Sequence, residues 1–373
     1  MTEVVSPVDT ETPAPPRRRL SRTLRAATAA WVLFFAAHVL LTGRWWLWMF
    51  VEPVPPLLLF VVPLLLLLLA ASVRPRPRWT ALVLVAVLVA GTPLAGFGGA
   101  GPGTAPRPGA PVLRIFSWNT GYWESGTGYK DFRGGDGTDA FYAYLKQQNA
   151  DVYLLGEHLH WNNGPVRLDD EPTLRARFPG YQVNVEGELV TLSRLPVVGT
   201  HPRRDGPEPD SWYWHGNKAQ RTDVRVGGCV FSLYNVHLPQ PVDTRLSPFT
   251  GRFYSFAHGQ YDRVETELGA LRADLAGNRN PLLVAGDFNS PWMGSLIPLG
   301  DGVEARDLTE GAPLPSSFPL ADTGWGMPRL WRLDWVFTRG EVDVARYAFR
   351  PNPRLSDHQA QDLTVSLPCG SAR

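Results

Sequence analysis

The sequence predicts a layered α/β domain preceded by an all-α transmembrane region of about three helices. The chain has 373 residues, and nearly all of its long apolar runs lie before Gly96. From about residue 112 onward, short apolar and β-rich runs alternate with helical segments or long loops. Strands separated in this way are typical of a layered α/β domain.

The first part of the chain has the pattern of a membrane region. Residues 1–25 are rich in Pro, Thr and Arg and lack apolar periodicity, so we predict a disordered tail there. Residues 26–96 contain three apolar stretches, at 26–41, 54–71 and 79–96, each near the length that crosses ~30 Å of hydrocarbon. Apolar side chains on every face favour membrane spans over buried core helices, and a signal peptide would supply only one such stretch.

Basic residues indicate the orientation of these spans. Arginines gather in the tail at 17–19 and in the second loop at 74–78, whereas the first loop holds little besides Arg44 and Glu52. Short loops rich in arginine stay in the cytoplasm. Three spans that begin inside end outside, which predicts a multi-pass protein of the cell membrane with its globular domain outside the cytoplasm.

The second part of the chain has the pattern of a globular domain on a tether. Residues 97–111 form a linker rich in Gly, Pro and Ala, and residues 112–373 form the predicted domain. Its expected strands lie at 113–117, 152–155, 230–236, 282–285, 333–337 and 363–367, and its expected helices at 139–148 and 261–275.

Composition limits the partners and the compartment. Residues 1–111 hold 10 Lys and Arg against 4 Asp and Glu, so 26 of the 36 basic and 31 of the 35 acidic residues belong to the rest of the chain. This excess of acidic residues disfavours nucleic acid as a partner, because DNA-binding domains present a basic face. Two cysteines, Cys229 and Cys369, are too few for a disulfide scaffold, and whether they form one bridge stays open.

Polar side chains stand at the ends of the expected strands, where an α/β sheet exposes its functional edge. They are Asn119, Glu157, His237, Asp287, Asn289, Asp334, Asp357 and His358. Any one of them alone is explained as a strand-end cap or turn residue. Their recurrence at successive strand ends indicates a shared site.

These residue types suit phosphoryl chemistry. Mg²⁺ takes carboxylate oxygens and keeps several waters, so one or two acids suffice as ligands. Asn and His supply neutral or cationic donors to phosphate oxygens, and an Asp beside a metal-bound phosphate can act as the base for water. A His that is paired with an Asp keeps one tautomer and supports positive charge.

The motifs around these residues form an ordered set. They are Trp118-Asn119, Gly156-Glu157, Leu192-Ser193-Arg194-Leu195-Pro196, Asn235-Val236-His237-Leu238, Gly286-Asp287-Phe288-Asn289, Leu333-Asp334-Trp335-Val336-Phe337 and Ser356-Asp357-His358. In this order, over residues 112–367, the set resembles the endonuclease/exonuclease/phosphatase superfamily, which includes pancreatic-type deoxyribonuclease and bacterial sphingomyelinases. The resemblance implies a DNase I-like four-layer sandwich. It extends to membrane-anchored bacterial relatives of the VanJ-like branch, which have three N-terminal spans.

The resemblance implies a metal site and a catalytic set. Glu157 would be the principal Mg²⁺ ligand, with Asn119 beside it and Asp357 near the metal, and Mn²⁺ is the alternative ion. The implied catalytic residues are Asp287, which positions or deprotonates the attacking water, Asn289, which holds a phosphate oxygen, His237, which contacts the scissile phosphate, and His358, which Asp334 orients toward the developing charge. Gly156 and Trp335 depart from the family pattern, where many members have Gln and Tyr or His, without removing a catalytic atom.

Three functions remain open for such a domain. The first is a phosphoesterase acting on a phosphorylated lipid, such as a polyprenyl pyrophosphate, because a short linker keeps its active site near the bilayer. The second is an extracytoplasmic deoxyribonuclease, and the third is a non-catalytic membrane sensor. Aromatic residues at 212–214 and Trp292, Trp325 and Trp331 either pack in the core or contact lipid.

Overall fold

The computed structural model describes residues 16–73, 77–97, 101–123, 138–161, 164–168, 170–202, 217–243, 245–311, 314–318, 330–350 and 355–368. These residues fall into two compact units. The helical unit comprises the chain up to Leu40 together with Leu57–Ala95, and the β-rich unit comprises Leu41–Pro56 together with the chain from Gly96 onward. Residues 41–56, which the apolar pattern assigns to the membrane region, are therefore part of the β-rich unit.

The helical unit contains α1 (Pro16–Leu41), α2 (Leu58–Ser72) and α3 (Arg78–Gly91). Within α1, Leu20–Leu41 forms 22 residues with a mean hydropathy of 1.7. At ~1.5 Å per residue this is about 33 Å of helix, enough to cross a bilayer. The other two helices are apolar but shorter, at 15 and 14 residues. Of the helices in the described part of the chain, α1 is the one candidate membrane span.

The prediction of about three transmembrane helices is therefore wrong in number, and prolines explain the difference. Pro55 and Pro56 delay the start of α2, while Pro77 and Pro93 flank α3. Proline lacks the backbone N–H and restricts the residue before it, so helices tend to start or stop at these points.

Residues 16–25 also differ from the predicted disordered tail, because α1 begins at Pro16. Arginine is a good helix former, and proline is accepted in a first turn.

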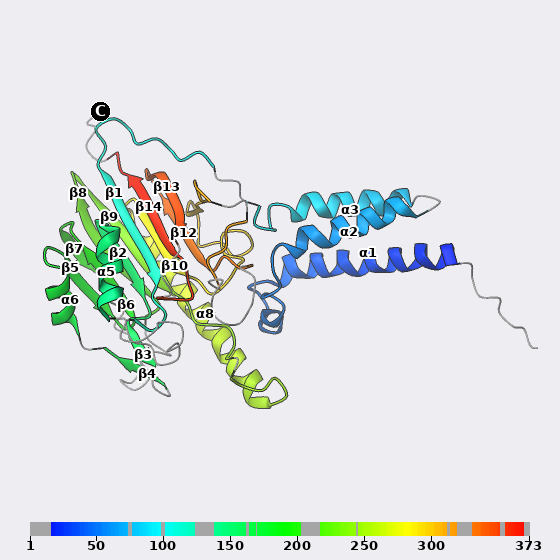
Figure 1. Cartoon of the computed structure of the whole chain (residues 1–373), viewed down its shortest axis with the longest axis horizontal. Coiled ribbons are helices and arrows are strands. Elements are labelled where there is room, and N and C mark those ends of the chain that lie inside the picture. The colour runs from blue at the N-terminus through cyan, green and yellow to red at the C-terminus, as the bar shows by residue number, and fades with distance from the viewer. Residues whose placement is uncertain are drawn as a thin grey trace, which may run out of the picture. The chain divides into compact units, whose positions relative to one another are not determined.

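The β-rich unit contains two six-stranded sheets with the orders β13-β14-β1-β2-β6-β5 and β11-β12-β10-β9-β8-β7 (Figure 1). The strands of the first sheet are β1 (Val112–Asn119), β2 (Val152–Gly156), β5 (Gln182–Glu186), β6 (Leu189–Ser193), β13 (Asp343–Arg350) and β14 (Ala360–Ser366). Those of the second sheet are β7 (Val197–Thr200), β8 (Ala219–Val226), β9 (Cys229–His237), β10 (Leu282–Asp287), β11 (Glu304–Ala305) and β12 (Asp334–Arg339). A small hairpin pairs β3 (Leu159–Trp161) with β4 (Pro165–Arg167).

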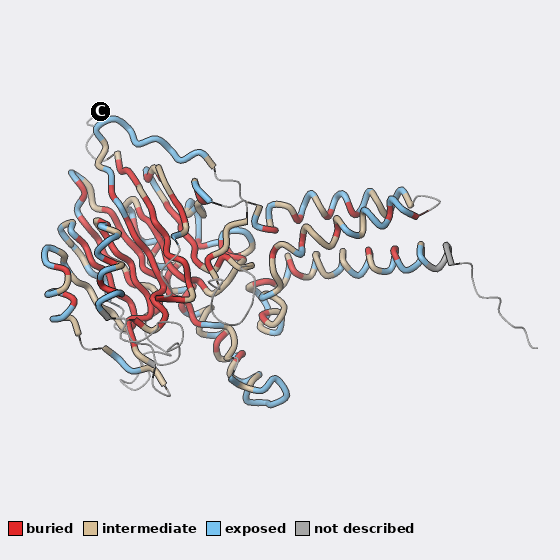
Figure 2. The backbone as a smooth tube through the Cα atoms, in the orientation of Figure 1, coloured by how far each residue is buried: buried red, intermediate tan, exposed pale blue. Residues whose placement is uncertain are grey.

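The two sheets pack face to face around an apolar core. Ile115 and Leu154 of the first sheet share this core with Leu233 and Leu283 of the second, and all four are fully buried. Figure 2 shows the buried strands of both sheets in red. Because the inner faces are sealed against each other and the outer faces are covered as well, the central strands read as unbroken apolar runs.

Helices cover the outer faces of the sandwich. On the first sheet, Phe116 and Trp118 pack under α5 (Thr138–Gln148) and α6 (Glu171–Arg177). On the second sheet, α8 (Gly251–Gly277) buries its leucines, and its Asp274 accepts a hydrogen bond of 2.6 Å from the Tyr234 hydroxyl. This arrangement confirms the predicted α/β sandwich of the DNase I-like type.

The described part of the linker lies along the β-rich unit. The N–H of Gly101 donates to the carbonyl of Leu308 at 3.1 Å, and the N–H of Thr104 donates to the carbonyl of Val344 in β13 at 2.9 Å. Residues 101–111 are thus attached to the sandwich rather than forming the free tether that their composition predicts.

The first residue of β9 is a cross-linked cysteine. Cys229 is disulfide-bonded. Cys369, the other cysteine of the chain, lies outside the described residues.

Candidate active site

The predicted site residues meet where parallel strands of both sheets end. β1 runs parallel to β2 with Asn119 opposite Gly156, and β9 runs parallel to β10 with His237 opposite Asp287. The antiparallel strand β12 places Asp334 opposite Asp287. A hydrogen bond of 3.0 Å from Nδ2 of Asn119 to Oδ2 of Asp287 joins the two sheets at this edge.

Glu157 follows the last residue of β2 and is buried. Its Oε1 accepts a hydrogen bond of 3.2 Å from Nδ2 of Asn119, and its Oε2 accepts one of 2.9 Å from the backbone N–H of Tyr122. Burial raises the pKa of Glu157, and the charge of His237 opposes this rise while neighbouring carboxylates add to it. A buried carboxylate whose negative charge is disfavoured in this way is suited to bind a cation.

The backbone is strained at two predicted site residues. Glu157 and Asn289 adopt left-handed conformations, with φ of 59° and 51°. For residues other than glycine, such conformations cost about 1–3 kcal/mol and cluster at functional sites. Glu157 directly follows β2 and Asn289 comes two residues after β10, so the turns there move these side chains out of the alternation of strand faces and toward the sheet edge.

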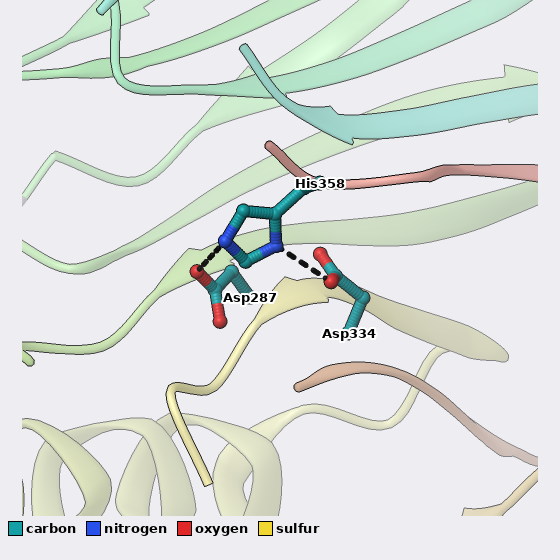
Figure 3. Close-up of side chains that lie close together, drawn as sticks. All are labelled: Asp287, Asp334 and His358. Carbon is teal, nitrogen blue, oxygen red and sulfur yellow. Dashed lines mark hydrogen bonds and ion pairs between the residues drawn. The ribbon is translucent and has the colours of Figure 1, made fainter. Parts of the chain in front are cut away.

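His358 lies between two carboxylates, as Figure 3 shows. Its Nδ1 lies 2.8 Å from Oδ2 of Asp334, and its Nε2 lies 3.5 Å from Oδ2 of Asp287. Burial lowers the pKa of His358, but the charges of Asp334 and Asp287 outweigh burial and raise this pKa well above its usual value. The imidazole is therefore held as a cation with a fixed orientation.

Sequence reasoning missed an ion-pair chain that supports His237. Nδ1 of His237 lies 3.1 Å from Oε1 of Glu188, which also pairs with Lys218, and all three residues are buried. Burial opposes ionisation of Glu188, yet the charges of His237 and Lys218 bring its pKa to about 2. Burial likewise lowers the pKa of His237, and the charge of Glu188 raises it to about 9. In the sequence, this ion-pair chain is indicated by the acidic residue Glu188, which stands directly before β6, a strand whose residues are all buried.

Asn289 and Asp357 lie at the same edge. The N–H of Asn289 donates to Oδ1 of Asp287 at 2.7 Å, and its Nδ2 donates to the carbonyl of Leu238 at 2.8 Å. An amide nitrogen carries two hydrogens, so Asn289 can also donate to a phosphate oxygen. Asp357 contributes negative charge to the surroundings of Glu157.

Two groups of side chains are candidates for a divalent cation. In the first, ligand atoms of Asp287, Asp334 and His358 lie within 4.8 Å of one another. A cationic His358 already balances these two carboxylates, so this group has less need of a metal. In the second, the predicted pair Glu157 and Asp357 offers the carboxylate oxygens that hard cations prefer. Burial raises the pKa of Glu157 as it does that of Asp287, so the choice of the second group rests on the charge balance that His358 provides in the first.

Asn119 donates to one carboxylate of each group, Glu157 of the second and Asp287 of the first. Its Nδ2 faces Glu157 and Asp287, while its Oδ1 accepts a hydrogen bond of 3.1 Å from the N–H of Gly121. In this arrangement the amide oxygen faces the backbone instead of the carboxylates. The side chain therefore acts as a donor to both acids.

The aromatic residues that the sequence singles out pack against protein where they are described. Trp292 is fully buried, and Nε1 of Trp331 donates a hydrogen bond of 2.8 Å to the carbonyl of Pro53. Residues 212–214 and Trp325 lie outside the described residues.

Comparison with known proteins points to one family. The Endonuclease/Exonuclease/phosphatase family model matches residues 128–358, more than half of the chain. Similar solved structures include truncated Caenorhabditis elegans TDP2, with 16% identity over 69% of this chain and 98% of that chain and a TM-score of 0.46. Another is an endonuclease/exonuclease/phosphatase from Bacteroides vulgatus, with 17% identity over 69% of this chain and 99% of that chain and a TM-score of 0.46. The comparison with curated proteins found no match. The chain belongs to the endonuclease/exonuclease/phosphatase family, whose members are hydrolases that act on phosphoester bonds.

Proposed function

We propose that this protein is a membrane-anchored, metal-dependent phosphoesterase that hydrolyses a phosphate ester or phosphodiester of a lipid-linked substrate at the outer membrane face. The observation that carries the proposal is the meeting of Glu157, His237, Asp287 and His358 at one edge of the sandwich. This edge joins acids for a cation, a base for water and cationic donors for phosphoryl oxygens.

The residues have separate tasks in this proposal. Burial raises the pKa of Asp287 against the opposing charge of His358, which makes this carboxylate a better proton acceptor for an attacking water. His237 and His358 are both held as cations and donate to the phosphoryl oxygens as negative charge develops there. Asn289 holds a further phosphate oxygen, and Asp334 fixes the orientation of His358.

A divalent cation fits beside these residues. Family members typically use such an ion, and we propose Mg²⁺, with Mn²⁺ as the alternative, held by Glu157 and Asp357 with Asn119 orienting Glu157. When bound, the ion neutralises charge on the phosphate and polarises its oxygens.

Membrane anchoring is proposed from α1 and from the cysteine. The apolar part of α1 is long enough to span, and its basic start favours a cytoplasmic amino terminus. A single span with this orientation places the β-rich unit outside the cytoplasm, as three spans would. The disulfide at Cys229 agrees with an oxidising compartment. We keep a relation to the VanJ-like branch as a proposal that rests on membrane anchoring alone, because the described part of the chain holds one candidate span in place of the three spans of those relatives.

The choice of a phosphorylated lipid over DNA follows from charge and position. The chain beyond residue 111 has more acidic than basic residues, 31 against 26, which is unfavourable for a duplex held by its phosphates. An anchored enzyme also meets lipid head groups at a high effective concentration.

One experiment tests the proposal. Purified full-length protein in detergent with Mg²⁺ is offered plasmid DNA, sphingomyelin, phosphoinositides and a polyprenyl pyrophosphate, with Asp287→Asn as the matched inactive preparation. We expect hydrolysis of at least one lipid, abolished by a chelator and at least ~100-fold slower in the variant. DNA cleavage as fast as lipid cleavage supports the deoxyribonuclease instead. Failure on every substrate, with no Mg²⁺ or Mn²⁺ bound, supports the non-catalytic sensor.

A further inference from the structure

The segment that follows α1, residues 41–56, is bound to the β-rich unit by specific contacts. Nε1 of Trp292 donates a hydrogen bond of 2.8 Å to the carbonyl of Glu52, and Nε1 of Trp331 donates one of 2.8 Å to the carbonyl of Pro53. Phe50 also stacks on Phe253 of α8, with ring centroids 5.4 Å apart. We call residues 41–56 the inter-helix segment.

These contacts reach the two loops that carry catalytic groups. Trp292 follows Asn289 in the loop after β10, and Trp331 precedes Asp334 at the start of β12. The loops are also joined to each other, because Nε1 of Trp335 donates a hydrogen bond of 2.9 Å to the carbonyl of Ser290. These hydrogen bonds therefore hold the inter-helix segment in a fixed position relative to the proposed active site.

The inter-helix segment is also the direct continuation of the proposed membrane span. It starts at Leu41, the last residue of α1, and ends before the apolar helix α2 begins at Leu58. A chain extends at most ~3.5 Å per residue. If α1 crosses the bilayer, the first residues of the segment lie within the head-group layer, and the parts of the β-rich unit that contact the segment are held close to it.

Large apolar side chains are exposed on the segment and on the adjacent start of α8. Trp45 and Leu47 of the segment are 44% and 38% exposed, Phe249 just before α8 is 96% exposed, and Tyr254 in the first turn of α8 is 43% exposed. We call these four side chains the aromatic face. Phe50 connects its two parts, because its ring meets that of Tyr254 edge-on at 5.6 Å. In Figures 1 and 2 the first turns of α8 extend beyond the strands and are largely exposed.

The side chains of the aromatic face suit the boundary between lipid and water. Tryptophan and tyrosine are enriched at the boundary between lipid and water, where an apolar ring and a polar group are accommodated together. Exposed arginines Arg44 and Arg252 stand beside the face in the sequence and suit anionic head groups.

We infer that the aromatic face lies in the head-group layer of the outer leaflet and holds the β-rich unit against the bilayer. This inference rests on the proposed membrane anchoring by α1. It deepens the proposed function, because a catalytic edge held at this level meets a lipid phosphate without extraction of the lipid from the membrane.

The test measures the depth of single side chains in the intact protein. Full-length Phe249→Cys is labelled with a bimane fluorophore and reconstituted in vesicles of phosphatidylcholine and phosphatidylglycerol that contain spin-labelled lipids. Val198→Cys on β7 is the matched control, because Val198 is 42% exposed but lies on the edge strand of the second sheet. The unsubstituted chain gives the background labelling. We expect at least roughly threefold stronger quenching at position 249, since interfacial side chains enter the bilayer by ~5–10 Å.

The same samples separate this inference from the proposed function. Retention of the protein in carbonate-washed vesicles reports anchoring, and hydrolysis of the soluble diester bis(p-nitrophenyl) phosphate reports the active site. Equal quenching at positions 249 and 198 in retained protein overturns the aromatic face as a docking surface, whatever the hydrolysis rate. Protein that is washed off the vesicles overturns the anchoring and this inference together, while hydrolysis alone decides the phosphoesterase.

Discussion

The pairing of His358 with Asp334 determines what the imidazole can do at the sheet edge. Asp334→Asn removes the negative charge that contributes most to the raised pKa of His358. We expect turnover to fall at least ~100-fold with little change in KM, because orientation and charge of the imidazole matter most as the phosphoryl charge develops. Steady-state kinetics on bis(p-nitrophenyl) phosphate, or on whichever candidate lipid is hydrolysed in the assay above, measures both parameters.

A second imidazole–carboxylate pair provides the control. Nε2 of His201 lies 2.9 Å from Oδ2 of Asp223, and His201 is exposed. His201→Ala should leave turnover unchanged within about twofold. A loss as large as that of Asp334→Asn would mean that such pairs affect folding and not the reaction.

The carboxyl of Asp223 makes the free energy of unfolding depend on pH in the acid range. Burial opposes ionisation of Asp223, but hydrogen bonds from Arg221, Ser232 and His201 outweigh it and bring its pKa below the usual 3.8. Its contribution to stability is therefore present above pH 3.8 and lost as the pH falls through the lower folded-state pKa. We expect Asp223→Asn to cost about 1–3 kcal/mol at neutral pH.

Thermal melting of both proteins across the acid range measures this effect. The difference between wild type and Asp223→Asn should shrink as the pH falls below 3.8. Glu341→Gln is the control, because Glu341 is 63% exposed in its ion pair with Arg107 and such pairs contribute at most ~1 kcal/mol. A difference that is constant with pH would show that Asp223 is not the titrating group.

The sequence predicted the site residues themselves better than the buried residues that pair with them and hold them in place. Asn119, Glu157, His237 and Asp287 stand at strand ends, and strand pairing alone brings such positions together. Glu188 was missed because it precedes a strand, and its link to His237 crosses between sheets, which no local pattern reveals.

At the level of elements, β10 depends on a glycine directly before Asp287, the proposed base. Gly286 has a φ of 142°, and an added Cβ would lie 2.0 Å from the carbonyl oxygen of Val236 in β9. Gly286→Ala must therefore push β9 and β10 apart. We expect strain of at least about 1–3 kcal/mol and a melting temperature lowered by roughly 5 °C or more.

Gly156 is the matched control for this substitution. It also directly precedes a site acid, but an added Cβ there would meet its nearest neighbour, Cβ of His237, at 3.7 Å, an ordinary contact. Gly156→Ala should melt within about 1 °C of wild type. Equal melting of the two variants would refute the backbone clash.

The predicted elements were those with continuous apolar runs. β2, β9 and β10 are almost entirely buried, so their apolar sequences indicate directly that they are strands inside the sandwich. β5, β7 and β13 were not predicted, because they alternate partly exposed and polar residues at or near sheet edges. Prolines delay the start of α2 and flank α3, so these helices are shorter than their apolar runs although α2 continues through Pro63, and this is why the number of spans was overestimated.

At the level of the whole molecule, the proposed membrane span α1 would decide the compartment of the β-rich unit by its orientation. A reporter that is active only outside the cytoplasm, fused after Arg373, should be active, because a span with a basic cytoplasmic start ends outside. A cytoplasm-restricted reporter at the same position should be silent, and the reverse pattern would refute the outside placement. In agreement with export, Cys229 should react with a maleimide only after reduction.

The position of β14 has a consequence for the timing of biosynthesis. β14 is the last strand in the described part of the chain, yet it lies inside the first sheet, where it pairs with β13 on one side and with β1 on the other. His358 lies two residues before it. A ribosome must therefore synthesise the chain through Ser366 before β1 gains this neighbour and His358 is held in the site. If His358 has its proposed role, the nascent chain is inactive toward phosphoesters until this strand is made, and we expect truncation before β14 to abolish hydrolysis.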